Sequence, residues 1–339
     1  MPMTTRRKFL TGVAAAGAAI TGFPGILRYA RAAEKVTLIT PFGFDSDFID
    51  MMNAYSGGHF AKEGLDAKVL GATGTVQSIQ AVIGGEAQFG RFSGIDFIRA
   101  VAAKDAPLQA VATLRQNLGF HIVSLKDKPV KSGADLRGKT IGLLSIGGST
   151  ETYIDVMIAQ AKVPKSEIKL IVAGNSPGEV ELIHKGRLDC FICTFSTAFT
   201  IQHTLNEPLE YLNVDDLVPA PGQVFHGTRE TLAGKPDLVL KVLRAMRSSM
   251  QEIMTQPIGP IFERAGKDFE IPGIKNIDNL VALQKQTIEE NWFGKRGKSA
   301  LLRNFPDSWQ AGCDALRTVG IVDVKDPTAL YTNAFVDKL

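Results

Sequence analysis

The sequence predicts an α/β fold with two lobes, each a doubly wound, mostly parallel sheet, followed by a helical C-terminal third. Short β-rich runs alternate with amphipathic helical segments from residue 35 to residue 214, which is typical of parallel strands joined by helices. From Pro236 onward the apolar spacing is helical only. A chain of 339 residues is also long for a single core, so two lobes are expected.

The elements of the first lobe follow from the switch between β-rich and helical spacing. Apolar side chains recur at helical spacing over 47–62, and small turn residues precede or end each further segment. We expect strands at 36–40, 66–70, 87–91 and 108–114, and helices at 47–62, 75–82 and 95–103.

A second set of the same kind follows, and then helices alone. We expect strands at 120–125, 140–144, 168–173, 188–193 and 209–214, with helices at 150–161, 177–185 and 196–205 between them. In the C-terminal third, helical spacing predicts helices at 236–253, 260–265, 277–292, 308–319 and 327–336.

The first residues have the pattern of a twin-arginine export signal. Arg6 and Arg7 precede an apolar stretch at 10–23, and Ala30-Arg31-Ala32 is a small-x-small cleavage pattern. The alternative is a membrane anchor, but the stretch is short and rich in glycine for a span of about 20 strongly apolar residues. We expect cleavage near Ala32 and a protein in the periplasm.

Removal of this signal changes the charge of the chain. Residues 1–32 hold five of the 38 Lys and Arg residues and no Asp or Glu, which leaves 33 basic residues against 35 acidic ones. No basic excess then favours a nucleic acid or an anionic membrane as partner.

Motifs of enzymes are mostly absent from the sequence. The five histidines are widely spaced, and we find no metal-ligand cluster, P-loop or dinucleotide fingerprint. Cys190 and Cys193 form a C-x-x-C in a β-rich run, where side chains three apart point to opposite faces of a strand. We interpret both, and Cys313, as core residues, and we expect no cofactor and no metal.

Turns with small or hydroxyl-bearing residues recur between strand and helix. In open α/β sheets such turns lie at the carboxyl ends of the strands, where ligands bind, and helix N-termini there favour anionic groups. Each hydroxyl could instead only cap its own helix. These turns are at 44–46, 73–75, 93, 147–150 and 194–197.

Several short motifs resemble those of a known family. They are Phe60-Ala61-Lys62-Glu63-Gly64-Leu65, Gly84-Gly85-Glu86-Ala87-Gln88-Phe89-Gly90, Asp135-Leu136-Arg137-Gly138-Lys139-Thr140-Ile141-Gly142 and Gly186-Arg187-Leu188-Asp189. They resemble periplasmic solute-binding proteins of ABC transporters, in the group of sulfonate, nitrate, taurine and thiamine-pyrimidine-precursor (NMT1/THI5-like) proteins. One departure is Gln88, where the family often has Asp.

The resemblance implies the type II periplasmic binding protein fold and a hinge. Residues 1–32 would be the signal, 33–118 with 224–339 lobe 1 and the C-terminal helices, and 119–223 lobe 2. The crossing segments would lie near Asn117–His121 and Gln223–Gly227, with ligand bound between the lobes. The matching cleft positions are Phe44, Asp45, Thr73, Gly74, Ser93, Gly148, Ser149, Thr150, Thr194 and Phe195, with His226 a weaker candidate.

For an anionic ligand, we expect Ser149 and Thr150 to bind the charged oxygens, with help from Arg91 if it faces the cleft rather than the surface. Phe44 and Phe195 would line an apolar part of the ligand unless they belong to the core. Asp45 would accept an amino group, or cap the helix that follows it.

The resemblance therefore implies a monomeric, non-enzymatic binding protein. It would capture a small polar or anionic organic solute, of the sulfonate, nitrate, pyrimidine or aromatic acid class, and deliver it to an ABC permease. Two alternatives remain open. One is an enzyme like the thiamine-pyrimidine synthases, since Cys190 and Cys193 partly resemble the cysteine-rich motif of those enzymes. The other is a sensor subunit that acts on a membrane kinase.

Overall fold

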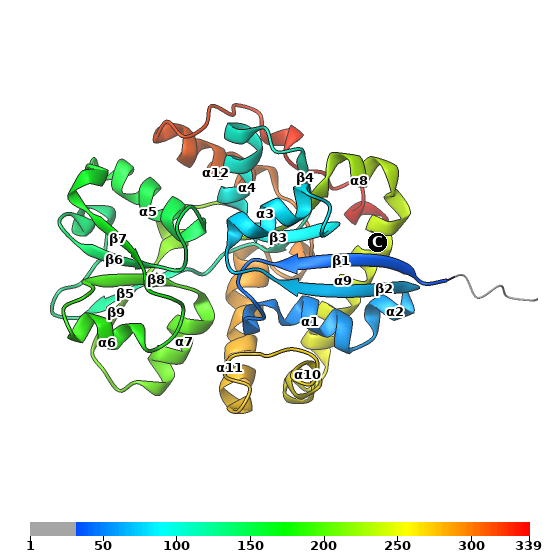
Figure 1. Ribbon diagram of the computed structural model, residues 1–339, viewed down its shortest axis with the longest axis horizontal. Helices are drawn as coiled ribbons and strands as arrows, with labels where there is room; N and C mark the ends of the chain where they lie inside the picture. The colour runs from blue at the N-terminus through cyan, green and yellow to red at the C-terminus, as the bar shows by residue number, and fades with distance from the viewer. Residues whose placement is uncertain (1–31) are drawn as a thin grey trace, which may run out of the picture. The chain divides into compact units, whose positions relative to one another are not determined.

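The computed structural model describes residues 32–339, so the predicted export signal lies outside the described residues apart from Ala32. Residues Ala33–Leu339 make one unit by their contacts. They form two five-stranded sheets (Figure 1). We call each sheet with its covering helices a lobe. Among these residues, no helix is long and apolar enough to cross a membrane.

Lobe 1 contains the strands that come first along the chain. Its strand order is β2-β1-β3-β10-β4. β1 pairs in parallel with β2 and β3, whereas β10 pairs antiparallel with both β3 and β4. The strands are β1 (Glu34–Thr40), β2 (Leu65–Gly71), β3 (Phe89–Ser93), β4 (Leu108–Arg115) and β10 (Gln223–Thr228).

Lobe 2 repeats this arrangement in the middle of the chain. Its strand order is β7-β6-β8-β5-β9, with β6 parallel to β7 and β8, and β5 antiparallel to β8 and β9. The strands are β5 (His121–Leu125), β6 (Thr140–Leu143), β7 (Lys169–Val172), β8 (Cys190–Cys193) and β9 (Leu209–Asn213).

In each sheet the single reversed strand is the first strand that the chain forms after it crosses from the other sheet. β5 follows the first crossing and β10 follows the second. The other four strands of each sheet run in one direction, so the predicted mostly parallel, two-lobed α/β fold is confirmed.

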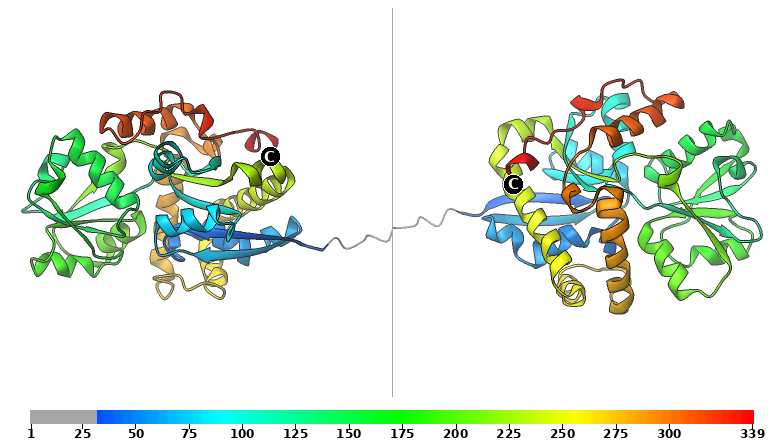
Figure 2. Two further views of the ribbon diagram at one scale, coloured as in Figure 1. Left: turned by 45° about the horizontal axis from the view of Figure 1, so that its top comes forward. Right: turned by 180° about the vertical axis from the view of Figure 1, so that it is seen from behind.

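Helices cover both faces of the lobe 1 sheet, as alternating strand residues require. Phe89 and Phe225 pack with α1 (Ile49–Ser56), α9 (Pro236–Thr255) and α10 (Ile258–Ala265) in one cluster. Phe92 and Val224, their strand neighbours, pack on the other face with α3 (Thr75–Ile83), α4 (Gly94–Lys104) and α12 (Pro306–Thr318). Figure 2 shows the same helices from two further sides.

The lobe 2 sheet is covered in the same way. Ile192 packs with α5 (Ser149–Gln160) on one face, and Phe191 packs with α6 (Glu179–His184) and α7 (Phe195–Thr204) on the other. Cys190 and Cys193 belong to these two different clusters, and both are buried free thiols. The prediction that they point to opposite faces of a strand is therefore confirmed.

Most predicted elements are present within a few residues of the expected bounds. The long helix expected at 47–62 is interrupted, with a 3₁₀ turn at Ser46–Phe48 before α1 and a separate α2 (His59–Lys62). The interruption lies at Gly57 and Gly58, and Gly58 takes a left-handed conformation with φ of 70° that favours glycine.

Two expectations are wrong. Residues 327–336 form no α-helix beyond a short 3₁₀ turn at Pro327–Ala329, because the segment runs beside the edge strand β4. Ala110 N–H donates to Leu330 O, and Thr332 N–H donates to Ala110 O, so the chain end covers an exposed sheet edge. The second crossing was expected near Gln223–Gly227, but those residues are β10, and the crossing segment precedes them at 214–222.

Two helices of the C-terminal third contact lobe 2: α12 packs against α5, and α11 (Ile277–Thr287) packs against α7. α11 continues into a π-helix at Ile288–Phe293, and Figure 1 draws α11 near lobe 2. Asn279 Nδ2 donates to Thr200 Oγ1 of α7 over 3.3 Å. The π-helix that follows α11 is hydrogen-bonded to the first crossing segment, since Asn117 N–H donates to Asn291 O.

Candidate functional site

A cleft of about 620 Å³ lies between the two lobes, within the range of small-ligand sites. Its walls come from three parts of the chain: the loops after the lobe 1 strands, the loops and helix after the lobe 2 strands, and the start of α11. The lining residues are Phe42, Gly43, Asp45, Ala72, Thr73, Leu144, Gly174, Asn175, Ser176, Pro177, Ser196, Thr197, Thr200, Thr204, Pro272, Gly273, Asn276, Asn279 and Leu280.

The topology of the sheets places these residues together. Asp45 and Thr73 follow the carboxyl ends of β1 and β2, and Asn175 follows β7 in the other lobe. The carboxyl ends of parallel strands share one edge of a sheet, and ligands of open α/β sheets bind outside that edge. The two edges face each other across the cleft.

Among the described residues, Asp45 is the one acidic side chain of the cleft lining. It is buried, and it connects the lobes: Ser196 Oγ donates to its Oδ1 over 2.9 Å and Asn175 Nδ2 donates to its Oδ2 over 3.1 Å. Within its own loop, Asp47 N–H also donates to Oδ1, over 2.9 Å. Burial, and then the nearby Asp47 carboxylate, raise the pKa of Asp45 to about 6.

The remainder of the lining is uncharged and combines apolar side chains, such as Phe42, Leu144 and Leu280, with polar ones. Amides come from Asn175, Asn276 and Asn279, and hydroxyls come from both lobes. Within the part of the chain that the structure describes, no lysine or arginine lines the cleft.

Asp45 forms no ion pair among the described residues, and the nearby Arg115 is paired with Asp47. A buried carboxylate of this kind disfavours a second negative charge nearby. This chemistry favours a neutral or cationic ligand that carries N–H donors.

Of the eleven residues predicted from the sequence, Asp45 and Thr73 line the cleft. Thr194 lies directly behind its wall, where its hydroxyl caps α7 by accepting from Thr197 N–H. Phe195 is buried and packs on Phe199 with ring centroids 6.3 Å apart, so it is a core residue here.

Four further predicted residues lie where the lobes touch outside the cleft. Ser149, at the start of α5, donates to Asp96 of lobe 1, and Gly148 precedes it. Ser93 caps α4 by accepting from Asp96 N–H, and a side chain at Gly74 would meet Ser145 of lobe 2 at 3.3 Å. Thr150 faces its own lobe, because its hydroxyl accepts from Leu144 N–H.

The other predicted residues lie away from the cleft. Phe44 packs on Phe269 with centroids 4.9 Å apart. His226 is fully buried beside Phe92, with ring centroids 4.4 Å apart, and burial lowers its pKa to about 3. Arg91 is fully buried, where it pairs with Asp50 and donates to Gln223 Oε1, so it connects α1 with β10 and does not face the cleft.

The sequence reasoning missed two parts of the wall. The turn Gly174-Asn175-Ser176-Pro177 follows a strand and precedes a helix, so the same strand-turn-helix rule could have found it. The contribution of Pro272 to Leu280 had no comparable signal, because it depends on how the C-terminal third packs against the lobes.

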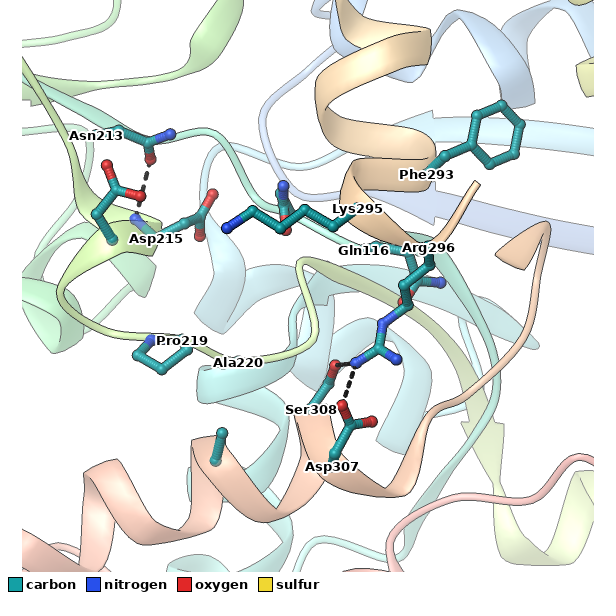
Figure 3. Close-up of a pocket in the computed structure, with 13 residues that line it drawn as sticks. Gln116, Asn213, Asp215, Pro219, Ala220, Phe293, Lys295, Arg296, Asp307 and Ser308 are labelled. Atoms are coloured by element: carbon teal, nitrogen blue, oxygen red, sulfur yellow. Dashed lines mark hydrogen bonds and ion pairs between the residues drawn. The ribbon is translucent and has the colours of Figure 1, made fainter. Parts of the chain in front are cut away.

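A second cavity, of about 530 Å³, lies beside both crossing segments (Figure 3). Arg296 is paired there with Asp307 over 2.6 Å, and Figure 3 shows Lys295 extending towards the side of the cavity formed by Asp215. Burial raises the pKa of Asp215 to about 6. Gln116 and Asn213 lie at the carboxyl ends of the edge strands β4 and β9. The cleft is instead lined by turns between strand and helix in both lobes, where ligands of open α/β sheets bind, so we assign the ligand site to the cleft.

The cysteines offer no reactive group to the cleft. Burial raises the pKa of the Cys190 thiol to about 12, and it raises the pKa of Cys193 well above its ordinary value. A thiol must ionise to act as a nucleophile or to ligate a metal. Nor do residues 32–339 hold a group of three or more His, Cys, Asp or Glu side chains arranged to bind a metal ion.

Comparison with models of protein families identifies the family of this chain. A model of the family described as NMT1/THI5-like matches residues 45–259, which is more than half of the chain and includes most of the cleft. The chain belongs to the NMT1/THI5-like family. The resemblance seen in the sequence motifs is thereby confirmed.

One relative of this NMT1/THI5-like chain is a formylaminopyrimidine-binding protein of Halalkalibacterium halodurans, 29% identical over 142 residues. That match covers 42% of each protein. Among solved structures, the periplasmic nitrate-binding protein NrtA of Synechocystis PCC 6803 has a TM-score of 0.70 at 13% identity, covering 90% of this chain and 88% of that one.

The alkanesulfonate-binding protein SsuA of Xanthomonas axonopodis pv. citri, bound to MOPS, has a TM-score of 0.66 at 14% identity. The match covers 89% of this chain and 99% of that one. These likenesses show that the fold is that of type II periplasmic binding proteins. A desulfurization enzyme also shares the fold, with a TM-score of 0.56 at 11% identity, so the function has to be argued from the site.

Proposed function

We propose that this protein is the solute-binding component of an ABC importer. It captures a small polar solute in the cleft by closure of the lobes about the two crossing segments, works as a monomer in the periplasm after export, and delivers the solute to a membrane permease. The family match, the fold of its solved neighbours and a cleft built from both lobes support this role.

The observation that carries the ligand class is Asp45. Its buried carboxylate borders the cleft, and no lysine or arginine among residues 32–339 belongs to the lining. We therefore infer that neutral nitrogen heterocycles with an amino group are better ligands than nitrate or sulfonates. Their amino group can donate to the carboxylate of Asp45 and to the amide oxygen of Asn279. The name of the Halalkalibacterium halodurans relative points to the same class of aminopyrimidines.

Calorimetric titration of the purified chain tests this assignment with matched ligands. 4-Aminopyrimidine and 4-methylpyrimidine have nearly the same shape but differ in the amino donor. We expect the amino compound to bind at least about tenfold more tightly, the effect of one hydrogen bond to a charged group. Nitrate and an alkanesulfonate serve as anionic comparisons.

One variant separates the effect of the negative charge of Asp45 from the effect of having a polar side chain at that position. Asp45→Asn keeps the shape and the cleft volume but removes the charge, so the preference for the amino compound should shrink to about threefold or less. Tight binding of nitrate or a sulfonate, with no heat from either pyrimidine, would contradict the proposed ligand class.

A further inference from the structure

Asp96 lies at a second contact between the lobes, outside the cleft. It belongs to the first turn of α4 in lobe 1, and its side chain is 0% exposed. Its carboxylate accepts from two hydroxyls of lobe 2: Ser149 Oγ donates over 2.5 Å and Thr152 Oγ1 donates over 2.7 Å. None of these three residues lines the cleft.

Neighbouring groups reinforce this contact across the lobes. Ser149 is the first residue of the 12-residue helix α5, so the carboxylate lies at a helix N-terminus, where negative charge is favoured. Thr75 Oγ1 of lobe 1 is 3.2 Å from Ser149 Oγ. Arg99 Nη2 lies 3.2 Å from Asp96 Oδ1 and donates to Gly147 O of lobe 2 over 2.6 Å.

The two hydroxyl hydrogen bonds exist only while α4 and α5 remain together, whereas Arg99 stays beside Asp96 on α4 in either arrangement. A buried carboxylate needs charge-assisted hydrogen bonds to offset the loss of water, and here both hydroxyl donors and the helix N-terminus belong to the other lobe. When the lobes separate, water must replace all of them. The free energy of this cluster therefore depends on the arrangement of the lobes.

We propose that Asp96, Ser149 and Thr152 form an interlobe latch, in which Asp96 is a positioning residue that favours the closed lobes without touching the ligand. The latch rests on the proposed function in one respect only, that ligand capture needs closed lobes. Its effect on the unliganded protein is independent of what the ligand is.

The variant Ser149→Ala/Thr152→Val removes both hydroxyl donors from lobe 2 and keeps the volume of the two side chains nearly unchanged. Small-angle X-ray scattering of the unliganded protein should then give a larger radius of gyration than for the natural chain. Amide exchange in residues 94–99 and 149–152 should rise about tenfold, as expected for a shift of about 1.4 kcal/mol in closure.

Tyr153→Phe is the matched control on the same helix. Tyr153 is fully buried and its hydroxyl has no hydrogen-bond partner among the described residues, so its loss should change neither scattering nor exchange. Thermal unfolding of all variants shows whether the chain remains folded.

A tether distinguishes an opened latch from a damaged fold. Asp96→Ala should open the lobes, and Thr75→Cys with Ser149→Cys in that background should form a disulfide across the contact. Oxidation should then restore the compact radius of gyration, and reduction should reverse it.

Unchanged scattering and exchange in Ser149→Ala/Thr152→Val would overturn the latch, as would an Asp96→Ala chain whose dimensions do not respond to the tether. Neither result depends on ligand binding. Failure of the ligand titrations alone would count against the proposed function and leave the latch standing.

Discussion

Asp45 and Asp96 are both buried carboxylates of lobe 1 that accept hydrogen bonds from lobe 2, yet they differ in what they face. Asp45 borders the cleft and bonds Ser196 and Asn175. Asp96 lies outside it and bonds Ser149 and Thr152. The same chemistry therefore has two consequences. Asp45 can exchange a hydrogen bond from lobe 2 for one from a ligand, whereas the hydrogen bonds of Asp96 with lobe 2 depend only on whether the lobes are closed.

The pKa of Asp45 leads to a prediction about pH. Because burial and Asp47 raise this pKa to about 6, the carboxylate that accepts an amino group is lost as the pH falls through 6. The dissociation constant of 4-aminopyrimidine should rise by up to about tenfold per pH unit below that value, after the ligand's own protonation is subtracted. Calorimetry across this range measures the effect.

The effect of Asp45 on the pH dependence of folding stability is opposite in sign to that of an ordinary ion-paired carboxylate. The folded chain binds this proton more tightly than the unfolded chain, whose carboxyl has the ordinary pKa of 3.8. The natural protein should thus lose stability relative to Asp45→Asn as the pH rises from about 4 to about 6. A pH dependence of binding that survives in Asp45→Asn would contradict this role.

At the scale of elements, the sequence predicted well whatever local pattern determines. Strands such as β8 carry buried residues on both faces and are recognisable as short apolar runs. The tail at 327–336 has helical spacing but lies along β4, because backbone bonds to Ala110 satisfy both the tail and the sheet edge. Local periodicity does not encode such a tertiary contact.

The candidate site was predictable to the level of loops, not of side chains. Turns after β1, β2 and β8 were expected at the cleft, and residues of each turn do line it or lie directly behind it. Which hydroxyl faces the cleft changes within a single turn: Thr194 caps α7, whereas Ser196, two positions later, lines the cleft. Ser149 was expected to bind a ligand because it is a hydroxyl at a helix N-terminus. It bonds Asp96 of the other lobe instead, a contact that the local sequence pattern does not show.

The α11 wall leads to a prediction about selectivity. Asn279 lines the cleft and donates to Thr200 of lobe 2, so Asn279→Ala removes one polar group from the wall and one contact with α7. Binding of 4-aminopyrimidine should weaken by about three- to tenfold, the effect of one neutral hydrogen bond. Calorimetry at neutral pH measures it.

Lys285→Ala is a suitable control for that change. Lys285 is exposed on the same helix and does not line the cleft, so its removal should leave binding unaltered. Equal affinities of Asn279→Ala and Lys285→Ala would show that the α11 wall does not contact the ligand.

At the scale of the whole molecule, both lobe contacts depend on the two crossing segments, which pack directly on each other. Gly222 N–H donates to Gln116 O. A side chain at Gly222 would meet the backbone carbonyl carbon of Asn117 at 2.3 Å, and backbone atoms cannot turn aside as a flexible side chain can. Glycine is needed here for close approach, and any change moves the segments that set the angle between the lobes.

Gly222→Ala should therefore alter closure without changing a group in the cleft. We expect folding stability to fall by about 1–3 kcal/mol, as for overpacking, and ligand affinity to fall about tenfold because fewer molecules reach the closed form. The compaction that ligand produces in X-ray scattering should shrink as well. Gly234→Ala is the control, since a side chain there would meet nothing within 4 Å. If Gly222→Ala kept natural affinity and compaction despite lower stability, the crossing segments would be structural supports, and the hinge would have to lie elsewhere in the chain.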